Sequence, residues 1–383
     1  MGILIYKYRR KLDRSIGNIL IKSINSLFNQ APDCHTVEDP KNILLIKFWG
    51  IGNLVMLTPS IKAVKKRFPN AKLHFLTLST NVGLLENLDY VDEVLYHNIG
   101  YSDIFKIFTT LFKYHKKFDI VIDFEPFLNI SSIISYFLGK YRIGFKIRTR
   151  ERHRLFDCTK DYVDDRHLVE QWYGLSKLVG FKEEDIRLES FTSFTENKKV
   201  DDFIAVNEIQ DNNLIGVHLG SSDNARVRQW PIDYFVELIN LLNNKFDNLS
   251  FVITGIESDK RLAEYVISKV NKDNCHSSCG LFDIKELIHF IKKCDLYVSS
   301  DTGPIHIAAA CGITCVGLYG PNSPLLYGPF GKNHLVFYKH PDCSPCLTNY
   351  NEKTTTCKKA LCLEHIKPKE VADKIIDHIQ TNK

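Results

Sequence analysis

The 383-residue sequence contains no uncharged apolar run of about 18 residues or more, so we expect no membrane-spanning helix. It also lacks the long hydrophobic segment and small-residue cleavage site of a secretory signal peptide. We therefore expect a cytoplasmic protein. In a reducing compartment its 11 cysteines, an odd number, are expected to be buried thiols or metal ligands rather than disulfides.

The body of the protein has little net charge. The formal charge of the chain is +5, and residues 1–30 account for all of it, because they hold Lys7, Arg9, Arg10, Lys11, Arg14 and Lys22 against Asp13. Nucleic-acid binding depends on an extended basic face, so we expect no nucleic-acid partner. A chain of this length with 44% hydrophobic residues is expected to form two globular domains.

Strand-like and helix-like segments alternate from residue 42 onward. The expected strands are 42–49, 72–78, 119–124, 141–145, 214–219, 249–254, 296–299 and 315–319, with helices between most of them. This rhythm predicts an α/β fold made of parallel sheets with helices on both faces. A polar stretch at 182–213 is the expected linker. We place an extension at 1–41, one domain at 42–195 and a second at 196–383, with ligands bound in a central cleft at the carboxyl ends of the strands.

Two candidate binding segments are ambiguous when taken alone. Gly50-Ile51-Gly52-Asn53 either lets a ligand approach the backbone or is an ordinary turn with Asn53 as helix N-cap. Glu257, after the strand ending in Thr254, either accepts hydrogen bonds from sugar hydroxyls or favours the dipole of the next helix.

Two other segments have anion-binding character. Ser221 and Ser222, followed by Arg228 before a helix, provide hydroxyls and a guanidinium for a diphosphate, whereas Arg226 is as easily a solvated loop cation. Asp301 is expected to cap the helix that carries His306. The amides of Thr302 and Gly303 would then lie at the positive end of this helix, where anionic oxygens are stabilised.

Five stretches of the chain resemble glycosyltransferase family 9, the heptosyltransferase family of lipopolysaccharide core synthesis. They are NILLIKFWGIGNLVMLTPSIKAVKKRFPNAKLHFLT, VIDFEPFLNISS, GVHLGSS, RQWPIDYF and DLYVSSDTGPIHIAAACGITCVGLYGP. The resemblance implies a GT-B fold of two Rossmann-like, doubly wound domains. It also implies inverting, metal-independent transfer of a sugar from a nucleotide diphosphate, commonly ADP-heptose, to an acceptor such as the lipopolysaccharide inner core.

The resemblance also implies roles for single residues. Arg228 falls where the family has a basic residue on the donor phosphates, and Glu257 on its nucleotide-side carboxylate. Asp301, Thr302, Gly303 and His306 fall on its donor loop. Arg228 and the amides at the start of the helix would stabilise the negative charge of the departing nucleoside diphosphate.

The chain departs from the family at Asn53, where an Asp is the usual candidate base. An amide does not accept a proton at useful pH, and base catalysis typically contributes about 10²–10⁴-fold. We hypothesise that Glu125 or Asp123, which end or follow the strand at 119–124, supplies the base. The alternative for Asp123 is to cap the next helix, and the alternative for Glu125 is to be solvated. A separate alternative for the whole protein is a family-9-like binding protein in which Asn53 marks lost activity. A nucleotide-sugar epimerase of similar architecture is a further alternative.

Three features remain outside these motifs. Residues 142–154 hold six cations, of which Arg148, Arg150 and Arg152 are the candidate contacts to an acidic or lipid-linked acceptor, if the stretch is not simply a solvated loop. The spacing of Cys343, Cys346, Cys357 and Cys362 suits structural zinc or iron rather than unligated thiols. Similar clusters occur in iron-binding heptosyltransferases that modify autotransporters, although the spacing differs.

Residues 12–28 place apolar side chains at helical spacing beside the basic residues. This amphipathic helix either docks on the protein or another copy, or lies on an anionic membrane surface through residues 1–30.

Overall fold

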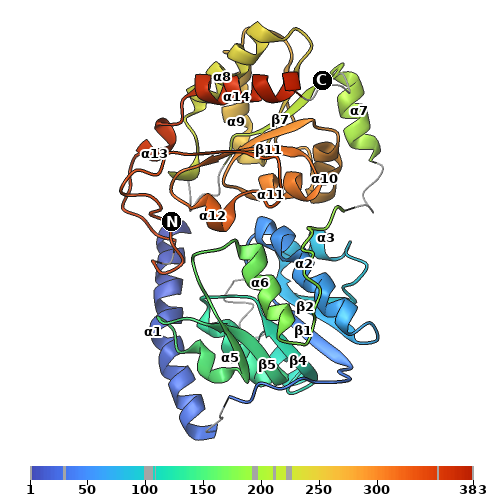
Figure 1. The fold of residues 1–383 in the computed structure, drawn as a ribbon, viewed down its shortest axis with the longest axis vertical. Coiled ribbons are helices and arrows are strands. Elements are labelled where there is room, and N and C mark those ends of the chain that lie inside the picture. Colours follow the sequence, from blue (N-terminus) through green and yellow to red (C-terminus); the bar gives the residue numbers. More distant parts are fainter. Residues whose placement is uncertain are drawn as a thin grey trace. The chain divides into compact units, whose positions relative to one another are not determined.

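The computed structural model describes residues 2–28, 32–98, 107, 109–191, 197–209, 213–220, 227–351 and 353–381. Within the first helix, the side chains of residues 13–27 are described. The chain forms two compact units, Met1–Leu188 and Glu189–Lys383. Each unit contains a parallel sheet and helices (Figure 1), which confirms the predicted α/β class.

The first unit contains a six-stranded sheet in the order β3-β2-β1-β4-β5-β6. All the strand pairs in it are parallel. Its strands are β1 (Asn42–Ile46), β2 (Lys72–Leu78), β3 (Glu93–His97), β4 (Phe118–Asp123), β5 (Gly139–Lys146) and β6 (Cys158–Asp161). Its helices are α1 (Gly2–Phe28), α2 (Ile51–Arg67), α3 (Val82–Leu85), α5 (Asn129–Leu138) and α6 (Leu168–Lys177), with 3-10 turns η1 (Ser79–Asn81) and η2 (Arg152–Leu155).

The second unit repeats this arrangement with the sheet order β12-β11-β10-β7-β8-β9, again in parallel pairs. Its strands are β7 (Leu214–His218), β8 (Ser250–Thr254), β9 (Cys275–Ser277), β10 (Leu296–Ser300), β11 (Thr314–Tyr319) and β12 (Leu335–Tyr338). Its helices are α7 (Lys198–Val206), α8 (Ile232–Lys245), α9 (Lys260–Ile267), α10 (Ile284–Lys292), α11 (Gly303–Ala310), α12 (Pro324–Tyr327), α13 (Leu361–Glu364) and α14 (Pro368–Thr381), with the 3-10 turn η4 (Glu257–Asp259).

Both sheets have the strand order of a Rossmann fold. Numbered within its own unit, each runs 3-2-1-4-5-6, and the order reverses between strands 1 and 4. That reversal lies between β1 and β4 in the first unit and between β7 and β10 in the second. In open parallel sheets, ligands bind beyond the carboxyl ends of the strands at this point.

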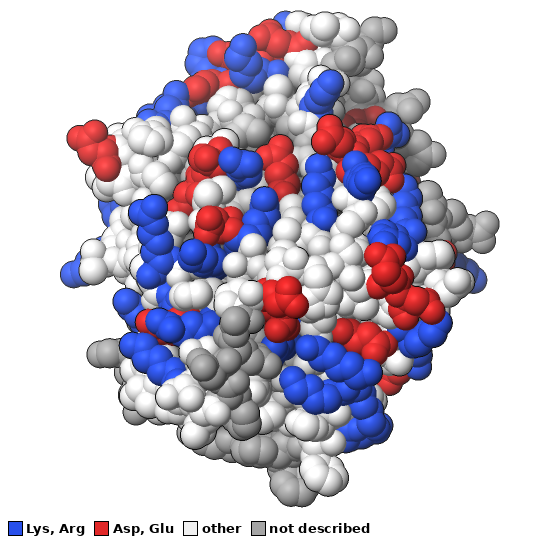
Figure 2. Space-filling view, turned by 60° about the horizontal axis from the view of Figure 1, so that its bottom comes forward, with Lys and Arg blue, Asp and Glu red and all other residues white. Residues whose placement is uncertain are grey.

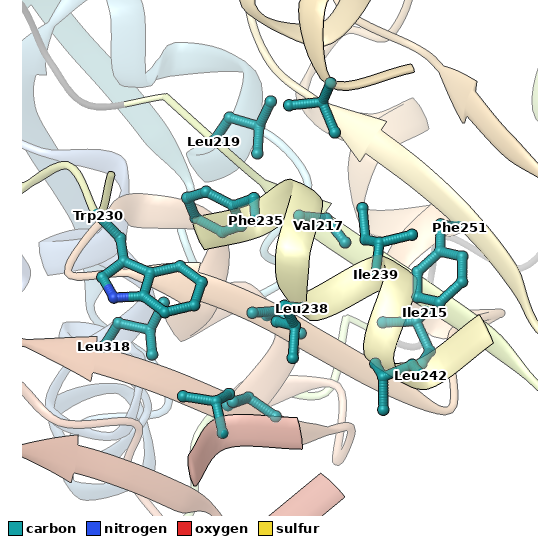
Figure 3. Close-up of a cluster of buried hydrophobic side chains, with 14 of the residues drawn as sticks. Ile215, Val217, Leu219, Trp230, Phe235, Leu238, Ile239, Leu242, Phe251 and Leu318 are labelled. Atoms are coloured by element: carbon teal, nitrogen blue, oxygen red, sulfur yellow. The ribbon is translucent and has the colours of Figure 1, made fainter. Parts of the chain in front are cut away.

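Apolar strands and amphipathic helices bury a core in each unit. In the first unit, Leu44 and Ile46 of β1 pack with Val121 of β4 and Ile134 of α5. In the second, α8 and α14 cover one face of the sheet. Figure 3 shows Phe235, Leu238 and Leu242 of α8 with strand residues Ile215 and Phe251. These cores fix the positions of the strand ends.

Helix α1 docks on the first unit through one face and lies alongside α5 (Figure 1). The carboxylate of Asp13 accepts hydrogen bonds from the amides of Asn129 (3.0 Å) and Ile130 (2.9 Å). Ile21 is fully buried in a cluster with Ile133. A side chain on Gly17 would collide with Asn129, whose Cβ would lie 2.6 Å away. The docked alternative for this helix is therefore observed within the chain.

The change from one unit to the other falls after Leu188, inside the stretch at 182–213 that the sequence analysis took as the linker, and this stretch also contains helix α7. One expectation about the cysteines was wrong. Cys34 and Cys158 form a disulfide, although the sequence suggested only thiols and metal ligands. These two residues are 124 positions apart, so no local spacing indicated the pairing. The other nine cysteines are free.

Candidate functional site

The reversal point of the first sheet holds a buried ion pair. Ile46 at the end of β1 is paired with Asp123 at the end of β4. The residues just beyond, Lys47 and Glu125, join through Lys47 Nζ and Glu125 Oε1 at 2.8 Å. Both side chains are almost fully buried, and the pair closes the loops after the two strands against each other.

Backbone amides also bind the Glu125 carboxylate. Oε1 accepts hydrogen bonds from the amides of Phe48 (2.8 Å) and Trp49 (3.3 Å) in addition to Lys47. Burial alone would raise the pKa of Glu125, but the Lys47 charge and these donors hold it below its ordinary value. Glu125 is therefore stabilised as an anion with three donors. These contacts suit a structural carboxylate better than the hypothesised general base.

Asp123 is also fully buried, and Arg152 is its partner. The Arg152 guanidinium binds the Asp123 carboxylate and the Glu125 carbonyl oxygen, and Ser131 Oγ donates to Asp123 at 2.7 Å. Burial raises the pKa of Asp123 to about 6, although Arg152 acts in the opposite direction. Its carboxylate accepts a hydrogen bond from the amide of Glu125, so Asp123 organises the loop after β4.

Asn53 lies in the first turn of α2 rather than at its N-cap. Gly50 occupies the cap position with φ 89°, a conformation that favours glycine. Asn53 Nδ2 donates to the Trp49 carbonyl at 3.0 Å, which ties the helix to the loop that Glu125 holds. The alternative in which Asn53 is the helix N-cap is thus excluded, and its role in transfer stays a prediction.

The reversal point of the second sheet gathers a second set of charges. Ser299 of β10 is paired with His218 of β7, and the chain after β10 leads directly to Asp301. Arg228 Nη1 donates to the Asp301 carboxylate at 3.1 Å and to the Asp301 carbonyl oxygen at 2.9 Å. Asn322, from the loop after β11, donates to the same carboxylate. Burial raises the pKa of Asp301, but Arg228 and Asn322 outweigh it and hold it below its ordinary value.

Helix α11 begins beside this ion pair. Thr302, not Asp301 as the sequence suggested, occupies its N-cap position, and the Thr302 hydroxyl lies 2.7 Å from Ser299 Oγ. The carboxylate of Asp301 binds Arg228 and Asn322 instead of capping the helix. Gly303 starts the helix with Pro304 next to it, and His306 is buried in its first turns. The structure thus brings Arg228, Asp301, Thr302, Gly303 and His306 to one strand end.

The remaining donor-side candidates are less closely placed. Ser221 and Ser222 lie outside the described residues. Glu257 is exposed in η4 and pairs with Lys260 at 2.8 Å. Asp259, which the sequence analysis did not consider, accepts a hydrogen bond from the Ile256 amide and lies so close to Gly220 that a Cβ there would be 2.6 Å from its carboxylate.

The basic stretch at 142–154 is not a uniformly exposed loop. Arg152 is fully buried on Asp123, so the prediction that it binds the acceptor is wrong: its guanidinium has a structural partner in the core. Arg142 is likewise buried on Asp157. Arg150 is buried, whereas Arg148 is exposed. Arg148 therefore stays the best-placed of the predicted acceptor cations.

The other three C-terminal cysteines lie within electrostatic reach of Cys362. Burial raises the pKa of Cys362 to about 11, and Cys346, Cys357 and Cys343 add to this effect. However, no three Cys, His, Asp or Glu side chains in the described part of the chain are grouped closely enough to hold a metal ion. The predicted structural metal is not shown by this arrangement and remains a proposal.

The charge of the surface shown in Figure 2 is mixed, and the described helices do not include a membrane-spanning one. On the face displayed in Figure 2, Lys and Arg gather in small groups with Asp and Glu between them. Among the described helices, none has both the length and the apolar character that crossing a bilayer requires.

Two Rossmann-type units, each with charged loops at its reversal point, are the arrangement of the GT-B fold. A family model described as glycosyltransferase family 9 (heptosyltransferase) matches residues 105–356. The chain belongs to this family, and it is therefore a glycosyltransferase. Because the chain belongs to this family, its activity is glycosyl transfer and not the nucleotide-sugar epimerisation considered as an alternative.

Similar proteins agree with this assignment. The lipopolysaccharide core heptosyltransferase OpsX of Haemophilus influenzae is 22% identical over 303 residues, covering 77% of this chain and 83% of OpsX. A family 9 glycosyltransferase from Veillonella parvula has a TM-score of 0.75 at 18% identity, covering 91% of this chain and 100% of its own. E. coli heptosyltransferase WaaC with ADP has a TM-score of 0.67 at 16% identity, covering 89% of this chain and 100% of its own.

Lys47, Asn322 and Lys353 contribute to these loops but were missed from the sequence. Lys47 left one signal, since it is a single charge within the apolar run NILLIKFW. Asn322 and Lys353 left none, because their contacts join segments that are distant in the chain.

Proposed function

We propose that the protein transfers heptose from ADP-heptose to an acidic or lipid-linked glycan such as the lipopolysaccharide inner core, with inversion and without a catalytic metal. The observation that carries this proposal is the Arg228–Asp301 pair beside the start of α11. OpsX is named for transfer to the lipopolysaccharide core, and WaaC was solved with ADP, which supports the choice of donor and acceptor.

The proposed chemistry follows from charge. Cleavage of the glycosidic bond to the diphosphate places additional negative charge on the departing ADP. Arg228 and the amides of the first turn of α11, at Gly303 and Ile305, offer fixed positive charge to these oxygens. Because this charge does not have to reorganise during the reaction, it favours the transition state over the bound donor.

The test is transfer from ADP-heptose to inner-core acceptor, compared with Arg228→Ala. We expect Arg228→Ala to lower kcat/KM for the donor about 10²-fold, because a charge-assisted contact of roughly 1.5–3 kcal/mol is lost. Lys245→Ala, an exposed cation at the other end of α8, is the control and should behave as wild type. Wild-type protein that binds ADP but turns over no acceptor would instead support the impaired binding protein that Asn53 suggests.

On the acceptor side, we propose that Arg148 contacts acidic groups of the glycan. Its side chain is exposed in the loop after β5, unlike Arg150 and Arg152. Exposed charges act through screened electrostatics, so salt should inhibit transfer steeply. Arg148→Ala should remove part of that salt dependence, whereas an unchanged salt profile would speak against this contact.

The exposed face of α1 is the proposed contact to an anionic membrane. Ile16, Ile19, Leu20 and Leu27 are 51%, 65%, 47% and 77% exposed on the described part of this helix. Arg14 and Lys22 are exposed on the same helix, whereas Asp13 binds the amides of α5. An apolar stripe with cations beside it suits the surface of anionic lipid.

Liposome flotation tests this contact. Vesicles with anionic lipid should carry the wild-type protein upward, and neutral vesicles should carry less of it. Changing Ile19 and Leu27 together to Glu should abolish flotation, while Val206→Glu, on exposed α7, should not. Equal flotation of all three proteins would exclude α1 as the anchor.

For the cysteine segment, we propose structural zinc or iron at Cys343, Cys346, Cys357 and Cys362, on the strength of the spacing alone. Elemental analysis of the purified protein tests this. About one metal per chain, lost in the Cys343→Ser/Cys346→Ser variant, is the expected result; metal-free protein with full stability would exclude it.

A further inference from the structure

The cysteine-rich segment after β12, residues 343–362, is hydrogen-bonded to the loop that follows β11. The amide of Leu347 donates to the Pro321 carbonyl at 2.8 Å, and Ser344 Oγ donates to the Gly320 carbonyl. Cys362 packs against the same loop, since a Cβ on Gly320 would lie 2.6 Å from its sulfur. Because β11 lies beside β10, this loop is next to Asp301. The segment is therefore anchored at the edge of the donor site.

Lys353 extends from this segment toward the Arg228–Asp301 pair. Its Nζ donates to Asn322 Oδ1 at 3.1 Å, and Asn322 Nδ2 donates to the Asp301 carboxylate. The Lys353 ammonium also lies 3.7 Å from the centroid of the Tyr327 ring. That ring is held in place, because Tyr327 Oη donates to Asn349 Oδ1 at 2.9 Å. Lys353 is thus positioned by contacts to α12 and to the loop after β11.

Two cations act on the Asp301 carboxylate. Arg228 pairs with it directly, and Lys353, which is linked to it through Asn322, contributes to lowering the pKa of that carboxyl. The start of α11 adds the positive end of a helix at the same place. Two cations beside the start of a helix suit an anionic group of the kind that a nucleoside diphosphate carries.

We propose that Lys353 is a donor-binding residue that supplies a second cation, besides Arg228, to the diphosphate of the donor. The cysteine-rich segment then has a function in the active site: it carries Lys353 to Asp301. This inference rests on the proposed function, because it takes the loop at Asp301 as the diphosphate site.

Binding of ADP and of adenosine to the full chain, measured by calorimetry, tests the inference. Lys353→Ala should weaken ADP about 10-fold or more, with adenosine unchanged, because only ADP carries the phosphates. Lys353→Arg should recover most of the affinity, and raising the salt concentration should weaken ADP less in Lys353→Ala than in wild type. Lys358→Ala, an exposed cation on the same segment, is the matched control and should bind as wild type.

Each other outcome has one meaning. If Lys353→Ala weakens ADP and adenosine equally, Lys353 only braces the segment, and the inference is overturned. If ADP binds Lys353→Ala as tightly as wild type, it is overturned as well, while the proposed function stands. If wild-type protein binds no ADP at all, the proposed function fails and the inference fails with it. Thermal unfolding of each variant confirms that a folded protein was measured.

Discussion

Lys47 and Glu125 are 78 residues apart in the chain, yet their charged groups lie 2.8 Å apart at the reversal point of the first sheet. Each follows a buried strand by one or two residues, so the parallel pairing of β1 with β4 brings them together. The same carboxylate binds the amides of the loop that precedes α2. This pair therefore sets the backbone on which Asn53 is presented.

Glu125→Gln should lower the free energy of unfolding by about 3–5 kcal/mol, because it leaves the Lys47 ammonium buried without an anionic partner. Urea unfolding measures this change. Glu183→Gln, which removes an exposed partner of Lys66, should cost less than about 1 kcal/mol. A Glu125→Gln protein of wild-type stability that loses transfer, and with it the acidic limb of its pH profile, would instead support Glu125 as the base.

Substitutions of Arg148 and Arg152, both in the basic stretch at 142–154, should separate an effect on stability from an effect on acceptor binding. Arg152→Met leaves the Asp123 carboxyl buried without its partner and should cost about 3–5 kcal/mol in urea unfolding. Arg148→Met should leave unfolding unchanged and raise KM for an acidic acceptor several-fold. Equal stability of the two variants would show that the buried pair adds nothing to the fold.

Asn53→Asp should increase the rate of transfer, since it places a carboxylate where the family carries its candidate base. The helix start at α2 favours a negative charge at this position. We expect a rise of about 10-fold in kcat at saturating donor, within the range that a positioned base provides, and a new acidic limb in the pH profile. The control is Asn244→Asp, exposed on α8. An unchanged rate would mean that another group already serves as the base.

The sequence predicted the strands that lie inside the sheets better than those at their edges. β2 spans Lys72–Leu78, as expected. A short apolar run with turn residues on both sides of it is typical of a buried strand. β3, β6, β9 and β12 were missed: each is three to five residues long, and each lies at the outside of its sheet. Edge strands bury less apolar side chain, so their periodicity is weak.

The sequence predicted which site residues lie together when they are adjacent in the chain, but not when distant residues pair. Asp301, Thr302 and Gly303 stand together in the sequence, and the structure keeps them at one strand end. Arg152 appeared to be one more cation in a basic stretch. Only the fold reveals its buried partner, Asp123, which is 29 residues away.

His218, at the end of β7, provides a prediction about pH. Its ring lies 3.3 Å from Thr254 Oγ1, and burial lowers its pKa to about 4, against an ordinary value of 6.5. Between these two values the unfolded chain binds a proton that the folded chain does not. The free energy of unfolding therefore falls as the pH drops from 6.5 toward 4.

His218→Gln removes this proton uptake and should flatten the profile. The ring is half-buried, so we expect an effect of about 1–3 kcal/mol. Between pH 7 and pH 4, the free energy of unfolding of wild type should fall by this amount relative to that of the variant. Urea unfolding at pH 7, 6, 5 and 4 measures it. Burial also lowers the pKa of His74, His153, His276 and His334, but these act equally in both proteins and cancel in the difference. Parallel curves for the two proteins would show that His218 is already free to bind a proton in the folded state.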